Sequence, residues 1–123
     1  MNNYESLTYK INGCAMKVHN TLGNGFQEVI YQRALAYEMD KAGLSFAREI
    51  EQDIFYKEWE EPIGTRRADF VVEGKVLVEL KAIVQIDNVH TAQILNYLKA
   101  YRLEVGLLIN FGSKSLTFKR LVL

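Results

Sequence analysis

The segment VLVELKAIV, residues 76–84, restricts the fold of this chain more than any other stretch. Its near-continuous run of Val, Leu, Ala and Ile is typical of a β-strand that other elements cover on both faces. Glu79 and Lys81 interrupt this run. Because successive side chains of a strand alternate, both lie on the face of Leu77 and Ile83. An exposed ion pair and a buried functional pair are equally acceptable interpretations of this strand alone.

The remainder of the chain predicts the layers that cover such a strand. Apolar residues recur at helical spacing before residue 42 and after residue 87, and the other apolar segments are short runs typical of strands. The predicted helices span residues 6–22, 27–42 and about 88–101, the last capped by Asp87 or Asn88. The predicted strands span residues 46–56, 65–72, 75–84, 105–110 and 116–121. The order ααβββαββ predicts one α/β domain over residues 1–123, with a mixed central β-sheet flanked by helices.

Composition restricts the partners and the cellular compartment. Fifteen basic and fifteen acidic residues give zero net charge, so an anionic substrate must be bound by a local patch or through a metal. The single cysteine, Cys14, excludes an internal disulfide and a cysteine-based zinc site, and it suits a reducing cytoplasm. The polar N-terminus MNNYESLTYK predicts no signal peptide, and no apolar run approaches the ~20 residues of a membrane helix. We therefore expect a cytoplasmic protein without membrane association.

A second charged residue in an apolar strand changes the interpretation of Glu79. Asp69, within RRADFVVEG, precedes Glu79 by ten residues. If adjacent strands bring these two carboxylates together, both stay ionised only where a cation neutralises them. Oxygen ligands suit Mg²⁺ or Mn²⁺, which also bind phosphate oxygens, and Lys81 can neutralise a phosphate or position an attacking water. The spacing Asp-x9-Glu-x-Lys therefore describes metal-assisted hydrolysis of a phosphodiester.

The turn between the two strands decides whether this site exists. A two-residue turn at Glu73-Gly74 pairs Asp69 with Val78 and sends the two carboxylates to opposite faces. A three-residue loop, or one bulge, pairs Asp69 with Glu79 on one face. Turn statistics favour the first register and the chemistry requires the second. We predict the second.

The quoted segments resemble a known group of proteins. ADF…VELK resembles the core of the PD-(D/E)XK nuclease superfamily, although Ala68 stands where the superfamily name has proline. GFQEVIY, residues 25–31, fits the name motif of the bacterial GxxExxY family within that superfamily at every fixed position. VELKAI, HTAQILNYLKA and VGLLINFGSKSLTFKR resemble the later blocks of that family in order. The resemblance implies a restriction-endonuclease-like fold, with an αβββαβ core and an extra N-terminal helix.

The resemblance also implies residue roles. Asp69 and Glu79, with the Leu80 carbonyl, are implied as ligands of Mg²⁺ (or Mn²⁺), and Lys81 as the catalytic lysine. Glu28, from the helix before the sheet, and Gln93, from the helix after the lysine strand, are implied as further site residues. The implied partner is nucleic acid, DNA rather than RNA, and a homodimer stays open.

Each accessory residue also has a purely structural interpretation. Glu28 opens a helix, where a carboxylate is favourable against the macrodipole, although Tyr31 and Leu35 place it on the apolar stripe. Gln93 is equally a polar residue beside its helix's core face. We expect His90 to be a surface or capping residue, and Tyr31 to pack or to hydrogen-bond Glu28. Five basic residues form either a phosphate-binding rim or a solvated edge: Arg66, Arg67, Lys114, Lys119 and Arg120.

Three functions are compatible with these patterns. The first is a metal-dependent nuclease, because a core without catalysis has no reason to tolerate two buried acids. The second is a catalytically silent nucleic-acid-binding or protein-interaction module that keeps the fold, which the zero net charge favours. The third is a structural scaffold with a buried Glu79–Lys81 salt bridge, which leaves Asp69 and Glu28 unexplained. We rank them in that order.

Overall fold

The computed structural model describes residues 4–123, and its elements follow the predicted order ααβββαββ. Residues 1–3, part of the polar N-terminus, lie outside the described residues. The helices are α1 (Glu5–Leu22), α2 (Glu28–Lys41) and α3 (Asn88–Tyr101). The strands are β1 (Phe46–Ile54), β2 (Gly64–Val72), β3 (Val76–Lys81), β4 (Val105–Asn110) and β5 (Thr117–Val122). Among the described residues, no helix is long and apolar enough to span a membrane.

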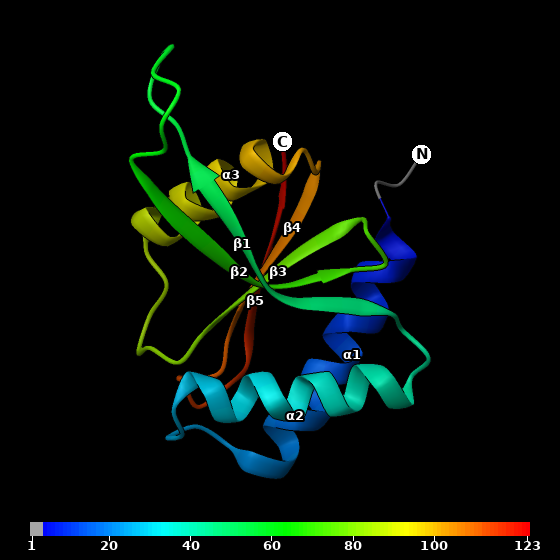
Figure 1. Ribbon diagram of the computed structural model, residues 1–123. Coiled ribbons are helices and arrows are strands. Elements are labelled where there is room, and N and C mark those ends of the chain that lie inside the picture. Colours follow the sequence, from blue (N-terminus) through cyan, green and yellow to red (C-terminus); the bar gives the residue numbers. More distant parts are fainter. Residues whose placement is uncertain (1–3) are drawn as a thin grey trace.

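The five strands form one mixed sheet in the order β1-β2-β3-β4-β5, and β3 and β4 are its parallel pair. Figure 1 shows α1 and α2 together on one side of this sheet and α3 on the other. The larger apolar cluster joins α1 and α2 to the sheet through residues such as Ile11, Leu35, Phe70 and Leu107. A smaller cluster joins α3 to the other face: Ala68, Leu77, Ile94, Leu98 and Leu108. The predicted fold class, a mixed sheet flanked by helices, is confirmed.

The loop between β2 and β3 has three residues, 73–75, as the chemistry of the site requires. Phe70 pairs with Val78, and Val72 pairs with Val76 across the loop. Extending this register by one residue sets Asp69 opposite Glu79. Glu73 adopts a left-handed backbone (φ 55°), and its carboxylate accepts the Ser45 N–H at 2.7 Å. The register that the chemistry required is therefore the one observed, and the two-residue turn that turn statistics favour does not occur here.

Strand β2 reverses its two faces at Asp69. Phe70 packs with α1 and α2, whereas Ala68, two residues earlier, packs with α3. In a regular strand these two side chains share a face. Directly across on β1, Glu49 has a left-handed backbone (φ 51°), between the pairs Arg48↔Phe70 and Ile50↔Ala68. Both strands are therefore distorted at the same point.

Helix α3 supports this distortion through Tyr101. The Tyr101 hydroxyl accepts the Ala68 N–H at 3.2 Å and donates to the Ile50 carbonyl. It thus bridges the two strands where their regular hydrogen bonding is disturbed.

The sheet forks immediately beyond this point. The last Cα partners between β2 and β3 are Phe70 and Val78. Beyond them, β2 stays paired with β1 as far as Gly64, and β3 stays paired with β4 as far as Lys81. Figure 1 shows β2 and β3 running together from their connecting loop and then diverging. Asp69 and Glu79 sit at the origin of the fork.

The left-handed residue on β1 gives a test of the distortion. A side chain in this conformation costs about 1 kcal/mol, and glycine avoids that cost while losing about 0.5–1 kcal/mol through its chain entropy. We expect Glu49→Gly to leave the free energy of unfolding within about 0.5 kcal/mol of wild type, and Glu51→Gly to lower it by about 1 kcal/mol. Glu51 is the matched control because both carboxylates contact Arg67, at 3.8 Å (Glu49) and 3.4 Å (Glu51). Urea denaturation measures both, and equal losses would contradict the expectation.

Candidate active site

Asp69 and Glu79 take the place of the missing hydrogen bonds at the fork. The Asp69 carboxylate accepts the Leu80 N–H at 2.8 Å through Oδ2. In return, Glu79 Oε1 accepts the Asp69 N–H at 3.2 Å. Each acid thus binds a main-chain amide of the opposite strand. The exchange brings the two carboxylates together, as the three-residue loop predicts.

The main chain adds an oxygen at the same place. The N–H and C=O of one strand residue point to the same neighbouring strand, so the Leu80 carbonyl is directed, like its amide, toward β2. The Lys81 carbonyl points the other way and accepts the Phe111 N–H at 2.8 Å. Because β2 has separated from β3 here, Cα pairing between them stops before Leu80. The donor set at the fork is therefore two carboxylates and one carbonyl.

The electrostatics favour a proton or a cation between the two acids. Glu79 is only 9% exposed, and this burial, with the charge of Asp69, raises its pKa from 4.5 to about 8, although the Asp69 N–H and Lys81 act in the other direction. Burial also raises the pKa of Asp69, against the Leu80 N–H, Gln32 and Lys81. At neutral pH the metal-free pair therefore retains a proton. A divalent cation would neutralise the pair in place of that proton.

The donor set fits Mg²⁺ or Mn²⁺. Within residues 4–123, no three His, Cys, Asp or Glu side chains are grouped closely enough to hold a metal. Mg²⁺ needs no such cage, because it binds through one or two carboxylates and keeps several waters. Asp69, Glu79 and the Leu80 carbonyl suit this mode of binding by their chemistry.

Sequence reasoning missed Gln32, which reaches the fork from α2. Gln32 is 7% exposed, and its Nε2 donates to Asp69 Oδ1 at 2.9 Å. Its Oε1 accepts from Arg48 Nη2, also at 2.9 Å. Because a guanidinium can only donate, this pairing fixes the orientation of the amide. Arg48, Gln32 and Asp69 form one chain from the exposed edge of β1 to the site.

Glu28 and Gln93 lie outside this hydrogen-bonded group. Glu28 is exposed at the first residue of α2, one turn before Gln32, and its charge is among those that raise the pKa of Glu79. It is therefore near the site without being buried in it. Gln93 is exposed on α3, one turn before Tyr97. Their functional roles stay predictions.

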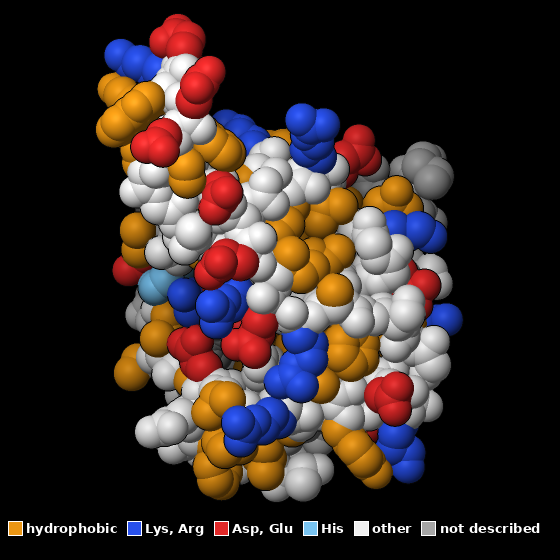
Figure 2. Space-filling model, in the orientation of Figure 1, with side chains coloured by type: hydrophobic (Ala, Val, Ile, Leu, Met, Phe, Trp, Pro, Cys, Tyr) orange, Lys and Arg blue, Asp and Glu red, His pale blue; other side chains and the backbone are white. Residues whose placement is uncertain are grey.

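Tyr97 and Lys81 lie on the α3 side of the fork. Burial and the charge of Glu79 raise the pKa of Tyr97, which places this ring near the acid. Lys81 is half-buried and lowers the pKa of both carboxylates. It makes no salt bridge within 4 Å to any carboxylate of residues 4–123, so the scaffold built on a Glu79–Lys81 salt bridge is not supported. Figure 2 shows acidic and basic side chains gathered around a hollow between α2 and α3.

Asn110 fixes the chain directly after Lys81. It is 1% exposed, its Oδ1 accepts the Ile83 N–H at 3.1 Å, and its Nδ2 donates to the Ile83 carbonyl at 3.0 Å. Gly112 approaches the same segment so closely that an added Cβ would lie 2.2 Å from the Ile83 nitrogen. The direction in which Lys81 leaves the sheet is thus held from β4.

The residues around the start of α2 have a structural role. Tyr31 is fully buried, stacks on Phe111 at 4.6 Å, and its hydroxyl donates to the Gly23 carbonyl at 2.6 Å. It packs, as expected, but its hydroxyl bonds the preceding loop and not Glu28. Gly25 allows that loop its left-handed turn (φ 109°). His90 is a capping residue, as expected, since its Nδ1 accepts the Asp87 N–H at 3.0 Å.

Two of the basic residues, adjacent on β2, differ in their surroundings. Arg67 reaches the carboxylates of Glu49 and Glu51, as the solvated-edge alternative expects. Arg66 instead lies over the ring of Tyr97, with 5.3 Å between the guanidinium carbon and the ring centre. The remaining three basic residues belong to the last strand and the loop before it: Lys114, Lys119 and Arg120.

The fold agrees with the comparisons to known proteins. The family model of the PD-(D/E)XK nuclease superfamily matches residues 5–121, so this chain belongs to that superfamily. Nucleases of this superfamily act on nucleic acid and typically use divalent metal ions. No sequence among curated proteins matches this chain.

A solved structure shares the fold. The crystal structure of SSO0001 superposes with a TM-score of 0.61 at 16% identity, over 76% of this chain and 48% of that one. This chain thus spans about half the length of SSO0001. At this identity the likeness concerns the fold alone.

The raised pKa of Glu79 gives a pH-dependent stability. Between pH 4.5 and about 8 the native protein binds more protons at Glu79 than the unfolded chain, so the free energy of unfolding falls as pH rises through this window. One proton corresponds to at most about 1.4 kcal/mol per pH unit. In EDTA, Glu79→Gln should flatten this decline and be the more stable protein by about 1 kcal/mol above the window.

The control is Glu73→Gln. The Ser45 N–H and nearby lysines lower the pKa of this exposed carboxyl. Its contribution to the free energy of unfolding is therefore lost at acid pH and not between pH 4.5 and about 8. Urea denaturation across the pH series should show the flattened decline in Glu79→Gln alone. The same decline in all three proteins would exclude Glu79 as its cause.

Proposed function

We propose that this protein is a metal-dependent nuclease of the GxxExxY type that hydrolyses phosphodiester bonds, in DNA rather than RNA. The observation that supports this most is the fork, where Asp69 and Glu79 bind each other's strand and the Leu80 carbonyl is directed to the same place. We extend the proposal to residues 1–123 acting as one domain in the cytoplasm.

The chain's own residues divide the work at the fork. Asp69, Glu79 and the Leu80 carbonyl would hold one Mg²⁺ or Mn²⁺. When bound, this ion polarises the scissile phosphate and lowers the pKa of a bound water. Gln32 holds Asp69 in place by its 2.9 Å hydrogen bond and keeps one carboxylate oxygen oriented. Glu28, exposed at the rim, is suited to contacting waters and not the ion itself.

Lys81 supplies the positive charge on the substrate side. It shares a strand face with Glu79 and makes no salt bridge that would have to break before a phosphate arrives. An ammonium in a partly dry site orients the attacking water or stabilises the charge of the transition state. Asn110 and Gly112 fix the segment after Lys81, which limits how far this ammonium moves.

The catalytic assignment predicts distinct failures in two variants and normal cleavage in a third. Wild type should cut DNA slowly with Mg²⁺ or Mn²⁺ and not with EDTA. Lys81→Ala should abolish turnover and retain metal binding, because Lys81 is no ligand. Asp69→Asn, which keeps an acceptor for the Leu80 N–H, should lose both. Lys75→Ala is the matched control and should cut normally, because Lys75 lies in the β2–β3 loop, at the end of the hairpin away from the fork.

Metal titration by calorimetry and gel assays on single- and double-stranded DNA and RNA check these outcomes. If purified wild type binds metal yet cleaves none of these substrates at high enzyme concentration, the silent binding module replaces the nuclease. Cleavage by Lys81→Ala at the wild-type rate would remove Lys81 from the mechanism.

Gln32 gives a separate test of the site's support. Gln32→Leu removes the amide that holds Asp69 Oδ1 and also releases Arg48. Loss of a partner that orients a metal ligand lowers metal affinity by roughly 10–100-fold, and we expect a loss of this size for Mg²⁺ and Mn²⁺. Gln27→Leu, at the exposed cap position of the same helix with no side-chain capping bond, is the control. Calorimetric affinities that are equal in the two variants would contradict a supporting role for Gln32.

One observation favours the silent module as a second candidate. Both oxygens of Asp69 already accept hydrogen bonds, from Gln32 and from the Leu80 N–H, without a metal. A site satisfied in this way keeps its shape without turnover. The cleavage assay separates the two candidates, because a silent module of this kind cuts no substrate whether or not it binds Mg²⁺.

A further inference from the structure

A cluster of basic side chains, separate from Lys81, lies on the α3 side of the fork. A cavity of about 440 Å³ opens between the outer halves of β1 and β2 and the last turns of α3. Three cationic side chains line it, Arg66 from β2 with Lys99 and Arg102 from the end of α3, against one acid, Asp53. Asn96, also in the lining, adds a neutral hydrogen-bonding group. In a chain of zero net charge, this is a local excess of positive charge.

The charges in this cavity are not neutralised by the protein. Within residues 4–123, Arg66, Lys99 and Arg102 form no salt bridge within 4 Å. The Nε of Arg66 is buried and has no hydrogen-bond acceptor among these residues. Basic residues at a helix C-terminus are favourable against the macrodipole, which accounts for Lys99 and Arg102 without a ligand. It does not account for Arg66, which is on a strand.

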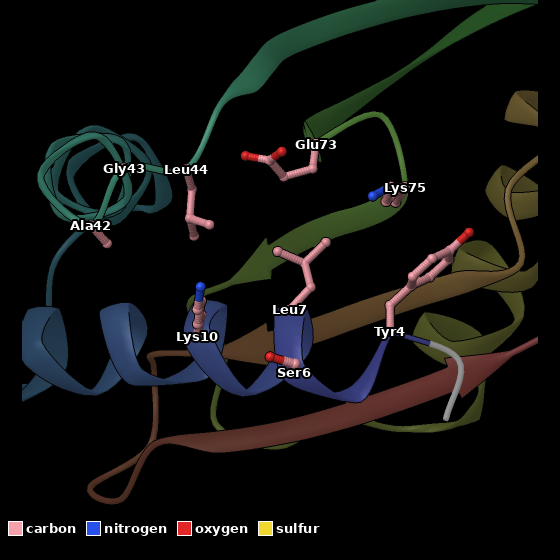
Figure 3. Close-up of a pocket in the computed structure, with 9 residues that line it drawn as sticks. All are labelled: Tyr4, Ser6, Leu7, Lys10, Ala42, Gly43, Leu44, Glu73 and Lys75. Carbon is pink, nitrogen blue, oxygen red and sulfur yellow. The ribbon is translucent and has the colours of Figure 1, made fainter. Parts of the chain in front are cut away.

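Another cavity shows the contrasting arrangement. The cavity of Figure 3, about 410 Å³ at the other end of the sheet, contains Lys10 and Lys75. Glu73 lies with them, and both lysines lower its pKa. Lys75 is also placed over the ring of Tyr4 at 5.7 Å. The charge of Glu73 thus acts on both lysines, and neither of them has a buried nitrogen without a hydrogen-bond partner, in contrast to Arg66.

The cationic cavity connects to the fork through Tyr97. Arg66 lies over one side of this ring, and the charge of Glu79 acts on its hydroxyl. A stacked guanidinium keeps its N–H edge free for a phosphate. Along β2, Arg66 and Asp69 are three residues apart, which corresponds to about 10 Å of strand. Successive phosphates of one DNA strand advance about 3.4 Å along the helix axis, so 10 Å corresponds to two or three nucleotides.

We propose that the cavity of Arg66, Lys99 and Arg102 binds a backbone phosphate of the substrate two or three nucleotides from the scissile phosphate. This inference rests on the proposed nuclease function, since it assumes that nucleic acid reaches the fork. Arg66 makes the central contact with the phosphate, and Lys99 and Arg102 add charge from α3. The contact fixes the register of the strand without reading its sequence.

The adjacent arginines provide a matched pair of variants. Arg66→Gln removes the proposed contact, and Arg67→Gln removes the same charge from the residue that pairs with Glu49 and Glu51. Binding of labelled DNA is measured by fluorescence anisotropy in a Lys81→Ala background with Mg²⁺, between about 50 and 200 mM salt. We expect Arg66→Gln to reduce the slope of log K against log salt by about 0.7–0.9, and Arg67→Gln to leave it unchanged.

A neutral methylphosphonate placed at successive positions locates the contact. At the proposed position it should weaken binding by the Lys81→Ala protein and by its Arg67→Gln derivative. It should weaken binding by the Arg66→Gln derivative less, because only Lys99 and Arg102 still act on the phosphate there. Because Arg66 packs on Tyr97, Arg102→Gln and Lys99→Gln repeat the salt series with two exposed residues. Each should also reduce the slope.

The outcomes separate this inference from the nuclease itself. Equal effects of Arg66→Gln and Arg67→Gln, or no effect of either, would overturn the phosphate site even if wild type cleaves DNA. A reduced slope for Arg66→Gln with no cleavage by wild type would support the phosphate site and reject the nuclease. No binding of nucleic acid at any salt concentration would reject both.

Discussion

The reciprocal bonding of Asp69 and Glu79 is the interaction on which the rest of this structure depends. Two strands that separate inside a sheet leave amide groups without partners, and a buried unpaired N–H costs about 1–3 kcal/mol. Here Asp69 accepts a hydrogen bond from the Leu80 N–H, and Glu79 accepts one from the Asp69 N–H, so both of the amides that the separation frees have a partner. The fork thus becomes tolerable because acids occupy it, and the acids stay together because the sheet forks. Glu49, with its left-handed backbone, and the Tyr101 hydroxyl complete the distortion on the far side of β2.

This arrangement is stable but not optimal for stability. Burial and mutual repulsion raise the pKa values of both carboxyls, so the metal-free fold retains a proton to relieve the charge. A layer of apolar side chains at these positions would remove that cost. The proposed divalent cation would replace the proton and would make the same charges favourable. The raised pKa values of this pair thus support the proposed metal site.

The sequence predicted more of the fork than of its surroundings. Asp69 and Glu79 were paired from strand register, because a side-chain period of two allows only two registers and the chemistry of the site selected one of them.

The positions of helix side chains relative to the site were less predictable. Helical periodicity shows which face of α2 is buried, but the depth at which its turns meet the sheet depends on packing with α1 and β3. The sequence therefore did not predict the contact between Asp69 and Gln32, which lies one turn beyond Glu28. Similarly, the charge of Glu79 helps to raise the pKa values of Tyr97 and Tyr101 on α3, whereas Gln93 on the same helix is exposed. The family resemblance implied Glu28 and Gln93 as site residues from their positions in a motif. A motif position also does not show how deeply a side chain is buried.

Zero net charge was an argument against nucleic acid, and the structure shows why it is a weak one. A net charge sums over all directions, whereas a bound strand meets one surface. Successive side chains on β2 alternate between its two faces, so Arg66 and Arg67 meet different surroundings. Arg67 is matched by two glutamates, and Arg66 lies over an aromatic ring that leaves its charge unmatched. Glu49 and Glu51 of β1 thus neutralise Arg67, whereas the cavity beside α3 holds three cationic side chains against the single acid Asp53. Local pairing, and not the total, decides what this surface attracts.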